Sequence, residues 1–179
     1  MSKVLIVVDA QEDFTRGALR NEEAIKALPT VHNVIRYAED HDFDIYCTMD
    51  THFKSELSNY LDTQEGKNLP IEHCIYQTNG WKLCKEVQGE KSHCTILKET
   101  FGYLDWRDEE LDPDEIWICG FCTDICVSAN FQILKATFPE VPITIIEDAC
   151  AGVTPELHDA AIKVMKSCQA HVVKFNELI

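Results

Sequence analysis

The sequence has no long hydrophobic run and few basic residues, and each shortage excludes a class of function. Its 179 residues contain no apolar stretch near the ~18 residues that a membrane-spanning helix needs. Residues 1–9 are too short, and too acidic at their end, for a secretory signal peptide, so we expect a cytoplasmic protein. The 16 basic and 31 acidic residues give a net charge of −15. We therefore expect no binding to nucleic acid or to anionic membranes, which both require a positive surface.

Nine cysteines are spread along the chain, and this odd number would leave one thiol outside any disulfide framework. Several lie inside apolar segments, as in IYCTMD and IWICGFC, where free buried cysteine is common. We expect reduced thiols, in agreement with a cytoplasmic location. The length suits one domain over residues 1–179, and the sequence contains neither repeats nor an interdomain linker.

Short apolar segments alternate with stretches of helical period, which is typical of a parallel sheet covered by helices. We expect strands at residues 4–8, 43–50, 94–98, 115–120, 141–148 and 171–175, and helices at residues 22–39, 123–138 and 155–167. Pro29 implies that the first helix kinks there or starts afresh. Residues 51–93 lack a clear period and predict a loop-rich insertion of functional importance. The sequence therefore predicts a three-layer α/β/α fold.

The residues that close the predicted strands have complementary chemistry. Asp9 ends the first strand, Asp50 the second and Lys98 the third. The fourth strand leads to Cys126, in the first turn of a helix, and ligands of open parallel sheets bind at this edge. A helix N-terminus and a nearby ammonium both favour the thiolate, so we expect Cys126 to be a low-pKa nucleophile that alkylates faster than the other cysteines. Asp9 would serve as general base and then general acid. The alternative is that these charged residues end strands only because strands end at water.

Three segments resemble the isochorismatase-like cysteine hydrolases, and the nicotinamidases among them in particular. They are VVDAQEDF at residues 7–14, LKETFGYLDW at 97–106 and ICGFCTDICV at 118–127. The resemblance implies a catalytic triad of Asp9, Lys98 and Cys126 that attacks a carboxamide and forms a thioester. It also implies a six-stranded parallel sheet and a homo-oligomer. A further implication is a cis peptide bond between Phe121 and Cys122, with the backbone amides of Cys122 and Cys126 forming the oxyanion hole.

Residues 51–93 also contain a candidate metal site. Asp50 and His52 lie two apart on an extended segment, so their side chains point to the same side. His73 follows in LPIEHC, which resembles a nicotinamidase segment that helps to bind Zn²⁺, Fe or Mn. No histidine lies between 52 and 73, so Glu65 is the best candidate for the fourth position. An Asp, two His and a Glu leave room for water or a pyridine nitrogen, and zinc is the first choice of metal.

Two alternatives concern the metal. His52 and His73 can be ordinary loop histidines without a ligand. A thiolate site would instead use Cys119, Cys122 and Cys126, but a structural zinc site expects a second C-x-x-C pair, which the sequence lacks.

Aromatic residues beside these segments are candidates for contact with a flat ring. Phe14 is the first choice for a pocket wall and Tyr103 the second, while Trp81 and Trp106 lie nearby in the sequence.

The leading hypothesis is an amidohydrolase that releases ammonia from a small, flat carboxamide, with nicotinamide as substrate. The alternatives are a carbamoyl or ureido amidase of the same fold, and a catalytically silent binding or scaffold protein.

Overall fold

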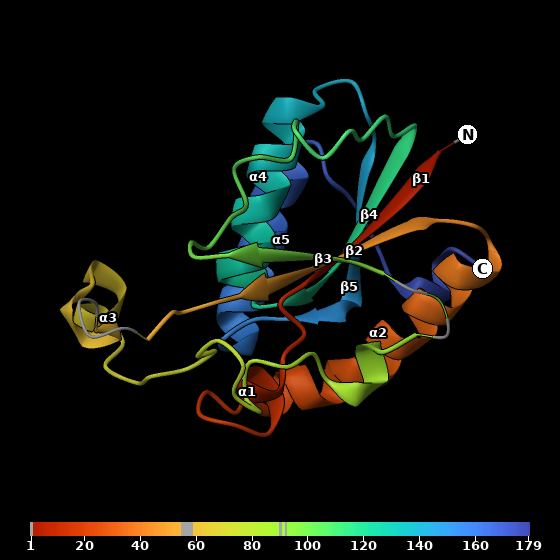
Figure 1. Cartoon of the computed structure of the whole chain (residues 1–179). Helices are drawn as coiled ribbons and strands as arrows, with labels where there is room; N and C mark the ends of the chain where they lie inside the picture. Colours follow the sequence, from red (N-terminus) through yellow and green to blue (C-terminus); the bar gives the residue numbers. More distant parts are fainter. Residues whose placement is uncertain (1, 55–58, 90, 92) are drawn as a thin grey trace.

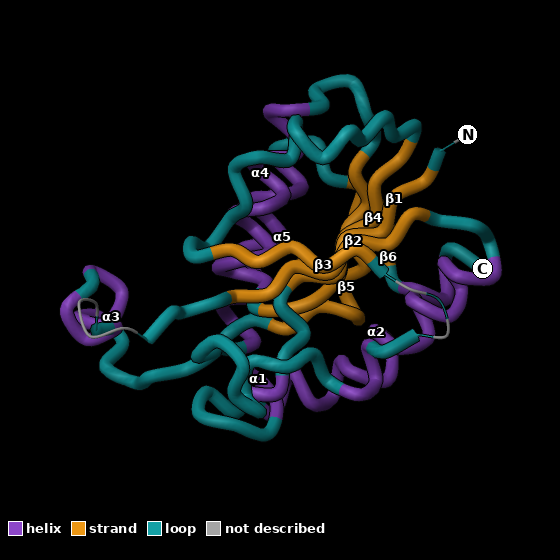
Figure 2. The backbone as a smooth tube through the Cα atoms, in the orientation of Figure 1, coloured by secondary structure: helices purple, strands orange, loops and turns teal. Residues whose placement is uncertain are grey.

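Six parallel strands form one sheet at the centre of the computed structural model, which describes residues 2–54, 59–89, 91 and 93–179. The strands are β1 (Lys3–Val8), β2 (Asp44–Asp50), β3 (Cys94–Lys98), β4 (Glu115–Phe121), β5 (Ile143–Ala151) and β6 (His171–Val173). Their order across the sheet is β3-β2-β1-β4-β5-β6, so the winding direction reverses at β1. Figure 2 shows the strands as a twisted stack between the helices. Ligands of such sheets bind near the point of reversal.

Helices cover both faces of the sheet (Figure 1). α2 (Glu22–Asp40) lies on one face, and α4 (Ser128–Thr137) and α5 (Pro155–Ser167) lie on the other. Shorter helices are α1 (Glu12–Thr15) and η4 (Phe175–Glu177). The predicted three-layer α/β/α fold with six parallel strands is confirmed.

α2 is a single helix that contains Pro29, so it does not start afresh at the proline. Ala24 and Ala27 are buried before the proline, and Val31 and Ile35 are buried after it. Packing of this one face on the sheet holds both halves in line, which outweighs the backbone hydrogen bond that proline removes.

The helix predicted from Thr123 begins differently. Its first turn, η3 (Thr123–Val127), is π-helical, and the α-helical part, α4, starts only at Ser128. The Val127 amide donates to the carbonyl of Cys122, five residues earlier, at 3.1 Å. Single π-helical turns often occur at functional sites.

Residues 51–93 form a long excursion between β2 and β3, and α3 lies apart from the rest of the chain in Figure 1. The excursion contains η1 (Tyr60–Asp62), α3 (Gln64–Asn68) and η2 (Lys85–Val87), which are too short to give a periodic signal in the sequence. Its two ends return to the same place, because the backbone of His52 bonds to Cys74 and Tyr76, each at 3.0 Å. This pairing brings His73 next to His52.

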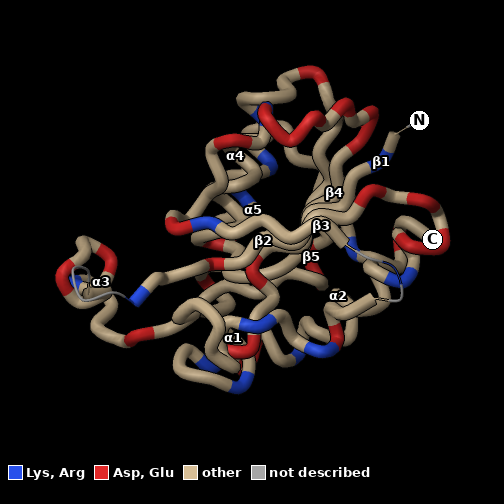
Figure 3. Tube along the Cα trace, viewed as in Figure 1, with Lys and Arg blue, Asp and Glu red and all other residues tan. Residues whose placement is uncertain are grey.

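Acidic residues are distributed over most of the chain, including a run at residues 105–115 (Figure 3). In the part of the chain that the structure describes, no helix is both long enough and apolar enough to cross a membrane.

Gly120, in β4, packs directly against the backbone of Val8 in β1. Its φ is +118°, and an added Cβ would come within 2.1 Å of the Val8 carbonyl oxygen. We expect Gly120→Ala to lower the free energy of unfolding by about 3 kcal/mol, because both the backbone angle and the contact become unfavourable. Urea unfolding measures the loss.

The matched control is Gly102→Ala. Its Cβ would come closer than 3.0 Å only to the tip of the Ile133 side chain, which can move. An equal loss of stability in the two variants would contradict the close approach of β4 to β1.

Candidate active site

A buried ion pair connects the ends of β1 and β3. The Lys98 Nζ lies 2.7 Å from Asp9 Oδ2 and 3.8 Å from Asp50 Oδ1. The exposed fractions of the Lys98 and Asp9 side chains are 1% and 0%. Thr48, on the intervening strand β2, donates its hydroxyl to Asp9 Oδ1 at 2.7 Å. The other oxygen of Asp9, Oδ2, faces the Lys98 ammonium, and this pairing opposes protonation of the carboxylate.

Cys126 lies beside this ion pair, with its Sγ 3.7 Å from the Lys98 Nζ. Cys126 belongs to the π-helical turn that follows β4. The peptide bond between Phe121 and Cys122 is cis, as predicted. The structure thus brings Asp9, Lys98 and Cys126 together from three separate segments.

Burial controls the protonation of these groups. It raises the pKa of the Cys126 thiol well above its usual value; the Asp9 carboxylate raises it further, and Lys98 opposes both. Burial also raises the pKa of Asp9, against the effect of Lys98. The expectation of a low-pKa thiol is therefore wrong for the free site, whereas the faster alkylation of Cys126 stays a prediction. Cys94, which is exposed, is the thiol to compare it with.

Asp50, His52, Glu65 and His73 form the cluster that the sequence predicted, here called the metal cluster. One potential ligand atom from each lies within 4.8 Å of all the others. Both histidine Nε2 atoms are 3.3 Å from Asp50 Oδ2. Glu65 Oε1 lies 3.5 Å from the His73 Nε2 and 3.8 Å from the His52 Nε2.

The surroundings of the metal cluster fit a divalent cation. The His52 Nε2 is buried without a hydrogen-bond partner in the described part of the chain. The Nδ1 of His73 lies 2.8 Å from the carbonyl oxygen of Ile71, which directs its Nε2 into the cluster. Burial lowers the pKa of His73, but hydrogen bonds to Asp50 and Glu65 raise it to about 10, so this position attracts positive charge.

Two residues of the first motif hold the metal cluster in place, and sequence reasoning missed both roles. Gln11 bonds to the backbone of Asp50 twice: its Oε1 accepts from the Asp50 amide at 2.8 Å and its Nε2 donates to the carbonyl at 2.9 Å. Asp13 Oδ2 accepts from the Cys74 amide at 2.7 Å, next to His73. In the sequence, the only indication of these roles was that both residues lie in the segment VVDAQEDF.

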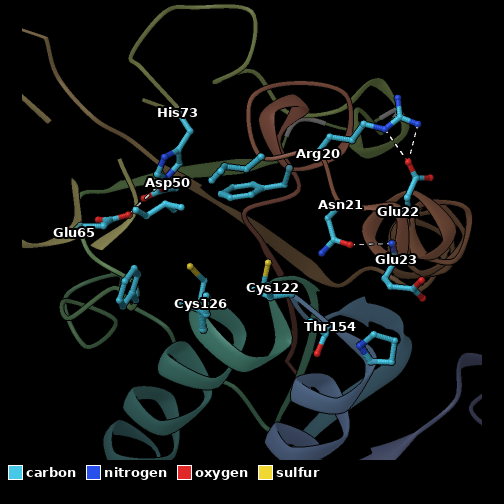
Figure 4. A pocket seen from close by; sticks show the side chains of 17 residues that line it. Arg20, Asn21, Glu22, Glu23, Asp50, Glu65, His73, Cys122, Cys126 and Thr154 are labelled. Atoms are coloured by element: carbon cyan, nitrogen blue, oxygen red, sulfur yellow. Dashed lines mark hydrogen bonds and ion pairs between the residues drawn. The ribbon is translucent and has the colours of Figure 1, made fainter. Parts of the chain in front are cut away.

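A cavity of about 510 Å³ lies above Cys126. In Figure 4, Asp50, Glu65 and His73 lie at one end of it, and the sulfur atoms of Cys126 and Cys122 point into it. Phe14 lines the cavity, as predicted, and its ring meets His73 edge-on at a centroid distance of 6.0 Å.

The prediction of Tyr103 as a wall of this cavity is wrong. Its ring packs edge-on against Trp106, with centroids 5.2 Å apart, and its hydroxyl donates to Glu109. Trp106 is fully buried. Phe101, two residues before Tyr103, lines the cavity instead. Trp81 is not part of the lining either, and its indole N–H donates to the Thr51 hydroxyl at 3.0 Å.

The thiolate alternative for the metal also fails. Among the described residues, Cys119, Cys122 and Cys126 do not form a group with metal-binding geometry. Cys119 is fully buried within β4. Cys122 follows β4 and, like Cys126, lines the cavity.

The chain resembles known proteins over almost its whole length. In a comparison with protein families, the Isochorismatase domain matches residues 3–177. A comparison with curated proteins gave no match.

Solved structures with this fold include three amidases. The pyrazinamidase of Pyrococcus horikoshii, in complex with zinc, is 26% identical with a TM-score of 0.81, and the match covers 98% of this chain and 100% of that one. The nicotinamidase/pyrazinamidase of Bacillus subtilis is 24% identical, with a TM-score of 0.81 and coverage of 97% and 100%. N-carbamoylsarcosine amidase of Thermoplasma acidophilum is 23% identical, with a TM-score of 0.77 and coverage of 97% and 96%. The similarities to the Bacillus subtilis and Thermoplasma acidophilum proteins show a shared fold only.

Asn130, a fully buried residue of α4, connects the Cys126 turn to the loop after β3. Its Nδ2 donates to the carbonyls of Cys126 at 2.8 Å and Phe101 at 3.3 Å. Its Oδ1 accepts from the Tyr103 amide at 3.0 Å and from the Trp106 indole at 3.1 Å. Every hydrogen-bonding position of this amide is therefore used.

We expect Asn130→Asp to lower the free energy of unfolding by about 2–3 kcal/mol, because a carboxylate oxygen would face two carbonyls without a donor. A buried carboxyl group here keeps its proton in the folded state, so its folded pKa is raised. Relative to the wild type, the variant should therefore lose least stability at low pH and more as the pH rises. Urea unfolding at several pH values measures this.

The matched control is Asn68→Asp. The Asn68 Nδ2 also donates to the carbonyl four residues earlier, that of Gln64, but on the exposed surface of α3. Its effect on stability should be small at every pH. Equal effects at the two positions would show that burial of the Asn130 amide is unimportant.

Proposed function

Because the chain belongs to the isochorismatase family, we propose that it is a cysteine amidohydrolase that releases ammonia from a small, flat carboxamide, with nicotinamide as substrate. The observation that carries this proposal is the 3.7 Å contact between Cys126 Sγ and a lysine that is itself paired with Asp9. Cys126 lines the same cavity as Asp50, Glu65 and His73 of the metal cluster, so one small molecule can reach both. Hydrolysis of nicotinamide would give nicotinate and ammonia.

The first half of the reaction forms a thioester. Asp9 takes the thiol proton of Cys126 as the sulfur attacks the amide carbon, and Lys98 stabilises the negative charge on the sulfur. The backbone amides of Cys122 and Cys126 would donate to the resulting oxyanion, the latter as an N-terminal amide of a helix. Asp9 then passes the proton to the nitrogen as the C–N bond breaks, and ammonia leaves.

The second half hydrolyses the thioester. Asp9 accepts a proton from water, the hydroxide attacks the carbonyl carbon, and the C–S bond breaks. The proton returns to Cys126, and the carboxylate product leaves. Burial raises the pKa values of Asp9 and Cys126, which favours the proton-bound form of each, and each holds the proton in turn in this sequence.

We also propose that the metal cluster holds a divalent ion, with zinc the first choice and iron or manganese as alternatives. The set of two nitrogen and two carboxylate ligands supports this, as does the buried His52 Nε2, whose 3.3 Å contact with Asp50 Oδ2 is not a well-formed hydrogen bond. When bound, the ion supplies a Lewis-acid anchor for a ring nitrogen. Phe14, Asp9 and Lys98 would then fix the ring and its amide near Cys126, which supplies the positioning that catalysis needs.

A carbamoyl or ureido amidase would use the same three residues but has no need of a ring-nitrogen anchor, so the metal cluster favours an aromatic amide. A catalytically silent protein would not need Cys126 in contact with the Lys98–Asp9 pair. An ammonia-release screen over nicotinamide, pyrazinamide, ureidoacrylate-like and carbamoyl compounds separates the three.

We further propose a cytoplasmic location, which the nine free cysteines support, and a homo-oligomer, which follows from the family resemblance.

Cys126→Ala should lower kcat at least about a thousandfold, because no other group can form the thioester. Its fold should be retained, since only a small side chain is lost; circular dichroism checks this. Ammonia release with nicotinamide as substrate measures the activity.

The control is Cys168→Ala, a substitution just after α5 and outside the cavity, which should keep full activity. If Cys122→Ala were inactive while Cys126→Ala kept full activity, Cys122 would be the nucleophile instead.

Purified protein should contain about one divalent ion per chain, and His73→Ala should lose most of it because the cluster keeps only three of its ligands. Elemental analysis after dialysis measures the content. The control is His32→Ala, which removes a surface imidazole that contacts the Glu86 carbonyl and should keep the ion. Absence of metal from both native and metal-supplemented protein would remove the anchoring role and much of the case for nicotinamide.

A further inference from the structure

The cavity above Cys126 is larger than the substrate of the proposed function. Its volume of about 510 Å³ lies within the range typical of pockets for drug-sized ligands, about 300–1,000 Å³. One pyridine ring with its carboxamide fills only the part between the metal cluster and Cys126. Figure 4 shows the remainder: the cavity continues past Cys122 toward Asn21 and Thr154, at the end opposite His73.

This second part of the cavity, here called the helix-end compartment, lies where α2 and α5 begin. Its lining residues are Leu19, Asn21, Cys122, Val153, Thr154 and Pro155. Asn21 connects the two helix ends, because its Nδ2 donates to the carbonyl of Gly152 at 2.7 Å.

The polar side chains of the helix-end compartment already form hydrogen bonds within the protein. Asn21 Oδ1 accepts from the Glu23 amide at 2.9 Å, and the Thr154 hydroxyl accepts from the Leu157 amide at 3.2 Å. The side chains left to contact a ligand are mainly apolar. Val153 is one of them, and about half of it (49%) is exposed to solvent although it lines a cavity. Exposed apolar surface in a concave site is typical of a binding surface.

The charged residues at this end are paired with each other. Arg20 lies 2.8 Å from Glu22, and Lys26 lies 2.7 Å from Glu23. Among the described residues that line the cavity, Arg20 is the only lysine or arginine. An anionic group on the substrate would therefore meet two carboxylates and no unpaired cation, which is unfavourable.

We propose that the natural substrate is an aromatic carboxamide with a further uncharged, apolar substituent, and that the helix-end compartment binds this substituent. The proposal rests on the proposed function, which places the ring nitrogen at the metal cluster and the amide carbon at Cys126. One carbon of a pyridine ring is meta to both groups and points away from both. The proposal places a substituent on that carbon in the helix-end compartment.

Three amides test this with the full-length, zinc-loaded protein. They are nicotinamide, its derivative with a phenyl group on the carbon meta to both the nitrogen and the carboxamide, and the same derivative with a carboxylate on the phenyl ring. We expect kcat/KM for the phenyl derivative to exceed that for nicotinamide at least tenfold, because the added ring buries apolar surface that is otherwise in water. The carboxylated derivative should be poorer than the phenyl derivative.

Val153→Phe fills part of the helix-end compartment. We expect it to lower the ratio of kcat/KM for the phenyl derivative to kcat/KM for nicotinamide by at least tenfold. The matched control is Val164→Phe on the exposed face of α5, where 53% of the valine is accessible to solvent. It should leave the ratio unchanged.

Calorimetry measures how tightly nicotinamide and its phenyl derivative bind to the Cys126→Ala variant. This measurement distinguishes a failure of this inference from a failure of the proposed function. If nicotinamide releases ammonia but the phenyl derivative is no better, or the carboxylated one is preferred, the helix-end compartment has been misassigned and the proposed function stands. If no amide releases ammonia, the proposed function fails. Binding of the phenyl derivative at least tenfold tighter than nicotinamide then still supports the compartment, and any smaller difference overturns it.

Discussion

Two opposite charges, on Lys98 and Asp9, are held 2.7 Å apart with almost no exposure to water. A buried ion costs several kcal/mol unless it is paired, so neither side chain is tolerable here without the other. The pair depends on the register of three adjacent strands, in which Lys98 lies opposite Asp50 and Val8 lies opposite Thr48. Because Lys98 also lies 3.8 Å from Asp50, the same ammonium connects the base of the proposed reaction to the metal cluster.

The site is assembled from both halves of the sheet. The acid, the lysine and the metal cluster come from β1, β2, β3 and the excursion between β2 and β3, whereas Cys126 follows β4 on the other side of β1. Asn130 connects these halves beside the site, because its amide bonds to the carbonyls of both Cys126 and Phe101. The position of the sulfur relative to its neighbours is therefore set by a buried hydrogen-bond network as well as by the sheet.

The sequence predicts those features that depend on short-range patterns. Asp9 and Lys98 were placed correctly because apolar runs locate strand ends, and Glu65 joined the metal cluster because no histidine competed for the position. Tyr103 was misplaced because the path of its loop, rather than its distance along the chain, decides which aromatic ring faces the cavity. The raised pKa of Cys126 was also missed, since it arises from burial by segments distant in sequence. Both of these properties depend on long-range packing, which local patterns in the sequence do not show.

The protonated state of Cys126 has a consequence for covalent inhibitors. Burial raises the pKa of Cys126, and the pKa of the exposed Cys94 is raised as well, so reagents that require a pre-formed thiolate have no reason to prefer the cavity. A selective inhibitor should instead carry a mild, reversible electrophile, such as a nitrile or aldehyde, on a ring that the cavity recognises. The C–S bond would then form as Asp9 takes the proton, the same coupling that the proposed reaction uses. Selectivity in this protein would come from where the electrophile is held, and not from the acidity of the thiol.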